Sequence, residues 1–254
     1  MDRLSVAIIG NGVVGQATKR VIDKYHSVQM HDPLQNLVCD YELSDVVFIC
    51  TPSECVKEYL AKLEGHPFVY VRSTIPFHLV QDTNFAVWPE FLTERTAVHD
   101  SLNPTHNVVG GNAQQVDKLC ETTIFNEFDV TTNIYAALMK LTTNVYFAQK
   151  VSFANVMYNL CQEQNLDYNE LKRILGSDPR TWIKDHWTVP GPDGKFGYGG
   201  KCLPANVDIM LELVKGKDKD LIEKYKQYNE EQRDEDSNNR SGRIYRIQPS
   251  KKTS

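Results

Sequence analysis

The stretch Leu4-Ser5-Val6-Ala7-Ile8-Ile9-Gly10-Asn11-Gly12-Val13-Val14-Gly15 decides the fold of this chain. Its first six residues form an apolar run that stops at a glycine, which is typical of a strand buried on both faces of a parallel sheet. Residues 13–24 then have a helical pattern, and residues 27–31 favour a second strand. A strand, a glycine-rich turn and a helix in this order indicate the first unit of an alternating β/α domain.

The turn has glycines at positions 10, 12 and 15, and Asp32 follows the second predicted strand. In a dinucleotide-binding turn, the glycines allow a tight turn, a close approach to the pyrophosphate and packing of the helix on the strand. An acid in the place of Asp32 binds the ribose 2′-hydroxyl and repels a 2′-phosphate, so the sequence predicts NAD rather than NADP. A glycine-rich turn without a ligand is the alternative. The predicted cofactor-binding residues are Gly10, Asn11, Gly12, Val13, Val14, Gly15, Asp32, Thr51, Pro52, Ser73 and Thr74.

The same alternation continues along the first half of the chain. Residues 45–50, 68–71 and 108–109 favour strands, and residues 53–63 favour a helix. Short connections between such elements predict an α/β fold, with a Rossmann-type, doubly wound parallel sheet.

The second half is predicted to be helical. Apolar residues recur at near-helical spacing over about 133–164, which indicates one long helix that is apolar on more than one face and must be buried. Further helices are expected over 167–175 and from Pro204, on either side of a loop rich in glycine and proline. From Lys215 the chain is mostly polar, which favours a frayed helix and then a disordered tail. The predicted domains are a Rossmann domain, a smaller all-helical domain and a charged tail, at residues 1–131, 132–214 and 215–254.

Composition and charge restrict the class of protein. The chain has 254 residues, 24% of them charged, and a net charge of −5, which provides no basic footprint for nucleic acid. No apolar run approaches the roughly 20 residues of a membrane span, and the first residues do not form a signal peptide. The cysteines show no CxxC spacing, so we expect reduced thiols, no metal site and a cytoplasmic protein that binds neither nucleic acid nor membrane. The six are Cys39, Cys50, Cys55, Cys120, Cys161 and Cys202.

Two polar motifs lie in the first domain. Ser73 and Thr74 follow a predicted strand, at the sheet edge where ligands bind in open parallel sheets; a helix cap or a turn is the alternative. Glu90 and Glu94 are four residues apart, so in a helix they share a face and can divide base and positioning roles. A solvated acidic turn is the alternative for this pair.

Two further motifs lie in the helical half. Lys140 and Asn144 point the same way from the long helix, where an ammonium and an amide can hold an oxyanion; the alternative is that Lys140 extends to solvent. Cys202 follows the glycines of Phe196-Gly197-Tyr198-Gly199-Gly200-Lys201 and begins a predicted helix. A thiolate is stabilised at a helix N-terminus, which makes Cys202 a candidate nucleophile. A small buried thiol is the alternative.

Together these segments resemble the UDP-glucose/GDP-mannose dehydrogenase family of nucleotide-sugar dehydrogenases, over about residues 4–211. The motifs occur in the family's order, at residues 10–15 with Asp32, 73–76, 89–94, 138–144 and 196–204. The resemblance implies oxidation of a sugar C6 alcohol to a carboxylate in two NAD-dependent steps, through a cysteine thioester. It also implies a nucleotide-sugar substrate and a homodimer formed through the long central helix.

The resemblance assigns roles to individual residues. Cys202 is the implied nucleophile, Lys140 and Asn144 stabilise oxyanions, and Thr74 and Glu94 position or activate water. Glu90 shapes the sugar site, and Arg180 resembles the family's arginine that reaches a neighbouring subunit. The implied catalytic residues are Cys202, Lys140, Asn144, Thr74, Glu94, Glu90 and position 206. The implied substrate-binding residues are Glu90, Phe91, Leu92, Lys140, Asn144, Arg180, Phe196, Gly197 and Gly199.

Two departures from the family's pattern affect the expected activity. The aspartate that follows the cysteine motif is Asn206 here, and an amide neither acts as a base nor carries charge. Asp208 lies two residues further and would face away from that position in a helix. Family members usually carry another Rossmann-like domain that binds the nucleotide of the substrate, where only the polar tail follows here.

Two other functions remain open from the sequence. The chain is alternatively a non-catalytic NAD-binding relative that regulates or pairs with another subunit, which the Asn206 change favours. A hydroxy-acid dehydrogenase of the 6-phosphogluconate type is a further alternative, but such enzymes need no thiol, so the Cys202 segment argues against it.

Overall fold

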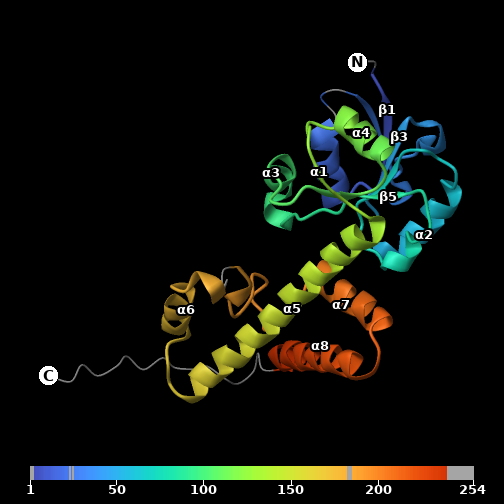
Figure 1. Cartoon of the computed structure of the whole chain (residues 1–254). Coiled ribbons are helices and arrows are strands. Elements are labelled where there is room, and N and C mark those ends of the chain that lie inside the picture. The colour runs from blue at the N-terminus through green and yellow to red at the C-terminus, as the bar shows by residue number, and fades with distance from the viewer. Residues whose placement is uncertain (1–2, 23, 25, 182–184, 239–254) are drawn as a thin grey trace. The chain divides into compact units, whose positions relative to one another are not determined.

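A computed structural model describes residues 3–22, 24, 26–181 and 185–238 of the chain. It contains two compact units, residues 1–143 and 144–254. The division falls within the long helix α5 (Asn133–Glu163), so this helix contributes side chains to both units (Figure 1).

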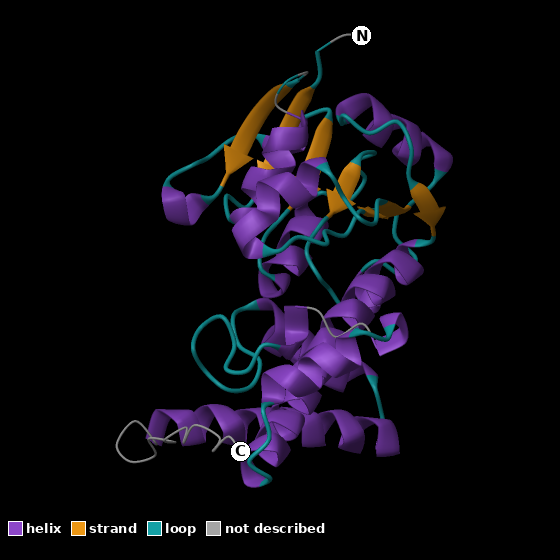
Figure 2. Cartoon of the chain, turned by 90° about the vertical axis from the view of Figure 1, so that its left-hand side faces the viewer, coloured by secondary structure: helices purple, strands orange, loops and turns teal. Residues whose placement is uncertain are grey.

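The first unit is built on a seven-stranded sheet with the order β2-β1-β3-β4-β5-β6-β7. All neighbouring strands are parallel except β5 and β6, so the sheet is mostly parallel and confirms the predicted fold class in the main (Figure 2). The strands are β1 Ser5–Ile9, β2 Ser27–His31, β3 Val46–Ile49, β4 Val69–Val71, β5 Ala86–Val87, β6 Val108–Gly110 and β7 Asp129–Thr131.

Apolar layers cover both faces of this sheet. Ala7 and Ile9 of β1 belong to one buried cluster, and Val6 and Ile8 belong to another. Successive side chains of a strand point to opposite faces, so an unbroken apolar run is the pattern that a strand covered on both sides requires. The helices of this unit are α1 Val13–Ile22, α2 Ser53–Lys62, α3 Ala97–Leu102 and α4 Ala113–Thr122.

The second unit is helical. Beyond its part of α5 it contains α6 Tyr168–Gly176, α7 Cys202–Leu213 and α8 Gly216–Asn238, and α7 and α8 pack against each other (Figure 1). Short 3-10 helices complete the described elements of the chain, at Pro33–Gln35, Tyr41–Leu43, Phe77–Leu79, Glu94–Thr96, Pro179–Thr181 and Asp185–Trp187.

The segment after residue 215, where a frayed helix and then a disordered tail were expected, begins with a helix. Residues 216–238 form one continuous helix, α8, and its Asn229 is buried. Ile222, Tyr225 and Tyr228 on the same helix are half-buried. The remainder of the expected tail, residues 239–254, lies outside the described residues. Within the described part of the chain, no helix is long and apolar enough to cross a membrane.

Candidate active site

The glycine-rich turn after β1 has the geometry expected of a dinucleotide-binding turn. Gly10 has φ +100°, and a Cβ there would lie 2.6 Å from the carbonyl oxygen of Cys50. A Cβ on Gly15 would overlap the carbonyl oxygen of Gly10, so the helix α1 packs tightly on the turn. A Cβ on Gly12 would meet nothing within 4 Å. The first and third glycines are therefore required by the protein itself, and the second faces space that a phosphate can approach.

Asp32 lies directly beside this turn. One of its oxygens, Oδ2, accepts the backbone N–H of Asn11 at 2.9 Å and the side-chain amide of Gln35 at 3.2 Å. Among the described residues, no hydrogen bond reaches the other oxygen, Oδ1. The acid and the turn are thus already joined, and one carboxylate oxygen remains available to a ribose hydroxyl.

The strands β3 and β4 bring further polar groups to the same edge of the sheet. Ser73 Oγ donates to the carbonyl oxygen of Thr51 at 2.6 Å, and Ser53 Oγ donates to that of Thr74 at 2.5 Å. Thr51 Oγ1 is buried and has no hydrogen-bond partner within the described residues. A buried hydroxyl without a partner is costly, so this atom and the open side of Gly12 fit the binding of a polar cofactor here. Asn11, Val13, Val14 and Pro52 flank the same turns.

Lys140 is buried and paired. Its ammonium lies 3.1 Å from a carboxylate oxygen of Glu90, and the two side chains are only 7% and 11% exposed. The ammonium also lies 5.3 Å from the centre of the Phe91 ring. Glu90 is further fixed because its second oxygen accepts the backbone N–H of Leu92 at 2.8 Å. The alternative that Lys140 extends to solvent is therefore wrong.

Glu94 does not join this pair. Residues 89–93 are not helical and Glu94 begins a separate 3-10 helix, so the inferred shared helical face of Glu90 and Glu94 is wrong. Glu94 is exposed, whereas Glu90 is held beneath the surface. Two side chains four residues apart lie close together only when the segment between them is helical. The segment that follows Pro89 is not helical. The water-activating role of Glu94 stays a prediction.

In the second unit, three residues of the cysteine motif and the long helix form one hydrogen-bonded chain. Asn144 Nδ2 donates to Asn206 Oδ1 at 3.2 Å, and Asn206 Nδ2 donates to the carbonyl oxygen of Cys202 at 2.8 Å. Asn144 and Asn206 are both buried. The amide of Asn206 thus acts as acceptor and donor at once, which a carboxylate in its place cannot do.

Cys202 is exposed and is the first residue of α7, as the sequence predicts. Thiolates at such positions are stabilised by the helix N-terminus. Cys50 at the end of β3 is the opposite case, since burial raises the pKa of its thiol to about 11. Asp208 cannot stand in for the missing acid, because it is held 2.7 Å from Lys226 on α8.

The remaining predicted substrate residues lie in two places. Arg180 is exposed and bonds to Asp178 of its own turn, with a shortest distance of 2.5 Å. Phe196, Gly197 and Gly199 lie in the loop before Cys202, where Gly197 is buried and Gly199 is half-buried.

Two features of the structure were not predicted from the sequence. Asn229 and Arg233 of α8 bond to the loop before Cys202; they lie in a polar stretch that carries no motif. Arg72, directly after β4, is buried with its guanidinium 3.7 Å from the centre of the Trp88 ring. Burial lowers the pKa of Arg72, and its position directly before Ser73 was the signal that could have identified it.

Known proteins resemble this chain in sequence. A family model, "UDP-glucose/GDP-mannose dehydrogenase family, central domain", matches residues 135–231. The UDP-glucose 6-dehydrogenase TuaD of Bacillus subtilis is 28% identical over 209 residues, which are 75% of this chain and 43% of that protein. The chain spans less than half the length of the curated relatives it matches.

Solved structures share the fold. A UDP-glucose dehydrogenase from the archaeon Pyrobaculum islandicum superposes with a TM-score of 0.73 at 19% identity, covering 91% of this chain and 68% of that one. A 3-hydroxyisobutyrate dehydrogenase from Mycobacterium tuberculosis has a TM-score of 0.72 at 13% identity, covering 92% of this chain and 96% of that one. These likenesses show the fold, whereas the motifs, the matched central domain and the sequence relatives distinguish between families. On that basis the chain is similar in sequence to the UDP-glucose/GDP-mannose dehydrogenase family, and the family model covers residues 135–231 of it.

Proposed function

We propose that the chain takes part in the NAD-dependent oxidation of a nucleotide sugar, converting the C6 alcohol to a carboxylate through a thioester on Cys202. The observation that carries this proposal is the position of Cys202, exposed at the first turn of α7 and bonded through Asn206 to Asn144. Neither a hydroxy-acid dehydrogenase nor a simple NAD-binding module requires this arrangement.

The overall reaction balances in three steps. Two electrons and a proton leave the alcohol as a hydride, with loss of a second proton, to give the aldehyde. The Cys202 thiol then adds across the aldehyde carbonyl, its sulfur bonding to carbon and its proton passing to the oxygen, to give a thiohemiacetal. Loss of a second hydride from that carbon, together with the hydroxyl proton, gives the thioester. Water cleaves the carbon–sulfur bond, which releases the carboxylate and restores the thiol. NAD, bound at the glycine-rich turn, supplies the hydride acceptor for both oxidations.

The side chains on α5 suit the charge that develops in these steps. Lys140 and Asn144 lie four residues apart on one helix, so an ammonium and an amide project from adjacent turns. Donors arranged in advance towards a developing oxyanion are worth several kcal/mol of barrier. The Glu90 carboxylate, 3.1 Å away, orients the Lys140 side chain until a substrate oxygen can share it. Thr74 and Glu94 are proposed to position the water.

NADH formation with a panel of nucleotide sugars tests this function. We expect NADH absorbance to rise with NAD and at least one of UDP-glucose, GDP-mannose and their N-acetylated relatives. The Cys202→Ala variant should form no carboxylate, and the matched variant Cys55→Ala should behave like the wild type. NAD binding with no NADH from any sugar would contradict the proposal.

Such a negative result would favour the second candidate, a non-catalytic NAD-binding subunit. The observation in its favour is Asn206, whose buried amide occupies the place of the family's acid. In such a subunit, bound NAD would stabilise the fold of this chain, and the chain would pair with another subunit.

We also propose that the chain forms a homodimer through α5. Tyr146, Phe153 and Leu160 are each about half exposed, and their seven-residue spacing places them on one helical face with Val156. An apolar stripe of this kind on a long helix suits pairing with the same helix of a second chain.

A further inference from the structure

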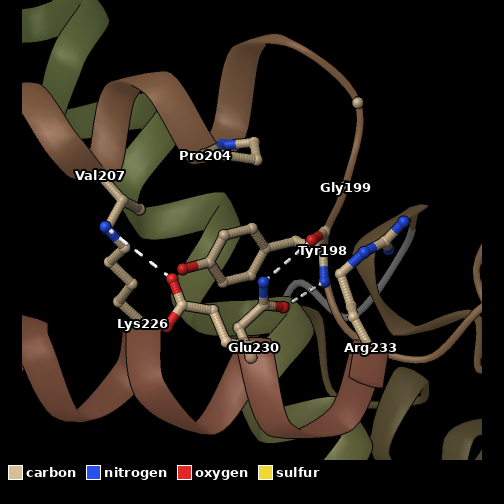
Figure 3. A pocket seen from close by; sticks show the side chains of 9 residues that line it. Tyr198, Gly199, Pro204, Val207, Lys226, Glu230 and Arg233 are labelled. Carbon is tan, nitrogen blue, oxygen red and sulfur yellow. Dashed lines mark hydrogen bonds and ion pairs between the residues drawn. The ribbon is translucent and has the colours of Figure 1, made fainter. Parts of the chain in front are cut away.

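A loop rich in glycine joins α6 to Cys202, and α8 lies against it. Figure 3 shows the place where they meet, with Tyr198 and Gly199 of the loop facing Glu230 and Arg233 of α8. A pocket of about 260 Å³ opens between the loop, α7 and α8. Nothing in the motifs assigns a role to α8, yet its polar side chains make specific bonds to this loop.

Asn229 binds the backbone of the loop with both ends of its amide. Its Oδ1 accepts the N–H of Tyr198 at 2.6 Å, and its Nδ2 donates to the carbonyl oxygen of Tyr198 at 3.0 Å (Figure 3). The side chain is only 5% exposed. A buried amide bonded to both the N–H and the C=O of one residue fixes the backbone on each side of that residue, and the loss of either bond leaves a buried polar group unsatisfied.

Arg233, one turn further along α8, covers the glycines on each side of Tyr198. A Cβ on Gly199 would lie 2.6 Å from its guanidinium nitrogens, and one on Gly197 would lie 2.5 Å from Asn229 Oδ1. The guanidinium also bonds to Asp193 at 2.9 Å and to the carbonyl oxygen of Phe196 at 3.4 Å. A side chain at Gly197 or Gly199 would collide with Asn229 or Arg233, so this contact with α8 requires glycine at both positions.

The contact between α8 and the loop matters for Cys202 because the glycines between them do not fix the backbone conformation by themselves. Gly199 and Gly200 lack a Cβ, and Gly200 has φ +74°, so sterics alone leave many conformations open to them. Only Lys201 then separates them from Cys202. The direction in which the chain enters α7 therefore depends on contacts that hold the loop before it. Among the described residues, these include Arg233 of α8 beside Gly199 and Asn155 of α5, whose Oδ1 accepts the N–H of Gly197 at 3.1 Å.

We propose that Asn229, with Arg233, is a positioning residue that fixes the glycine-rich loop and thereby holds Cys202 at the N-terminus of α7. The proposal rests on the proposed function in treating Cys202 as the nucleophile, but its test does not require turnover. It makes α8 part of the catalytic machinery rather than a dispensable tail.

The test uses the full chain with two substitutions of graded severity. Asn229→Asp keeps the acceptor for the N–H of Tyr198 and loses the donor to its carbonyl oxygen, whereas Asn229→Ala loses both. Gln227→Ala, at an exposed position on the same helix, is the matched control. The readouts are hydrogen exchange at the Tyr198 amide and the rate of Cys202 alkylation by iodoacetamide at neutral pH, mapped by mass spectrometry.

We expect faster exchange at Tyr198 in Asn229→Ala, with Asn229→Asp between it and the wild type. Alkylation of Cys202 should slow by about fivefold in Asn229→Ala, the factor that corresponds to the loss of about 1 kcal/mol. It should slow by less in Asn229→Asp and remain unchanged in Gln227→Ala. If the wild type turns over, Asn229→Asp should lower kcat with an unchanged KM for NAD, because the cofactor turn lies in the first unit.

Two results would overturn the proposal. Unchanged exchange at Tyr198 in either variant would show that Asn229 does not hold the loop. Faster exchange with wild-type alkylation of Cys202 would show that the loop does not position the thiol. If Asn229→Ala fails to fold, Asn229→Asp alone decides between these outcomes. Failure of the proposed function would give a different result. No sugar would then yield NADH, but the alkylation rates of Cys202 in the variants would still follow the predicted order.

Discussion

At the scale of single residues, Asp32 is proposed to control which cofactor the turn accepts. The Asp32→Ala variant should reduce the preference for NAD over NADP by about 10- to 150-fold, because a hydrogen bond to a charged group contributes about 1.5–3 kcal/mol. Calorimetric titration of each cofactor measures both affinities. The exposed Asp40→Ala variant serves as the control and should retain the preference. A wild-type chain that binds both cofactors equally would refute this role for Asp32.

The cysteines should differ sharply in reactivity. Limited alkylation at neutral pH should label Cys202 first, because it is exposed at a helix N-terminus. Cys50 should react only as the pH approaches 11, since burial raises the pKa of its thiol to about 11 and the thiol form persists below that pH. Peptide mapping across a pH series checks both expectations. Preferential labelling of another cysteine at neutral pH would mean that the nucleophile is misassigned.

In the proposed mechanism, the amide at Asn206 should slow the release of the thioester. A general base typically contributes about 10²–10⁴-fold, so the wild type should give a burst of NADH and then slow turnover. Asn206→Asp should raise the steady-state rate more than the burst. The same variant should unfold at a lower temperature, because a carboxylate cannot donate to the carbonyl oxygen of Cys202. Rapid-mixing kinetics and thermal melts measure these effects, and steady wild-type turnover without a burst would argue against this role.

The sequence could identify residues that belong to a motif. Asp32 and Cys202 were located this way because their chemistry depends on the local turn or helix that contains them. Asn229 could not be found, since one asparagine in a polar helix looks like its neighbours until the loop that it binds is placed beside it. Glu94 was placed wrongly because four-residue spacing was interpreted as helical.

At the scale of elements, helix α4 illustrates how a short element is fixed by its cap. Asn112 Oδ1 accepts the N–H of Gln115 at 3.0 Å, and Gln115 Oε1 accepts the N–H of Asn112 at 2.9 Å. Asn112→Ala should lower the free energy of unfolding by about 1 kcal/mol, as is typical of N-cap substitutions. Urea denaturation measures the change. The exposed Asn126→Ala variant should have no effect, and equal stability of both variants would exclude a role for this cap.

Strands that are buried on both faces were predictable from their apolar runs, as β1, β3 and β4 show. The strands β5 and β7 were not, because β5 has two residues and β7 is largely exposed. The antiparallel pairing of β5 with β6 depends on the path of the chain between them and leaves no pattern in the sequence. The helix α8 was expected to fray because the groups that its polar side chains bind are distant in the sequence and leave no local pattern.

At the scale of the whole molecule, the exposed face of α5 should mediate self-association. Phe153→Asp places a charge in the apolar stripe and should shift a dimer towards monomer. Ile174→Asp is the matched control, because Ile174 of α6 is similarly exposed but lies on another helix. Sedimentation velocity at micromolar concentration distinguishes the species. A wild-type chain that is strictly monomeric would count against the dimer.

Cys202 is proposed to form a covalent acyl intermediate during NAD-dependent oxidation of a nucleotide sugar. The most direct measurement is mass spectrometry of the Cys202 peptide after the chain is mixed with NAD and UDP-glucose or GDP-mannose and quenched in acid. We predict an acyl adduct on Cys202 that appears only when both NAD and sugar are present, with two NADH released for each adduct. An unmodified Cys202 peptide, under conditions where cofactor and sugar are both bound, would contradict the account.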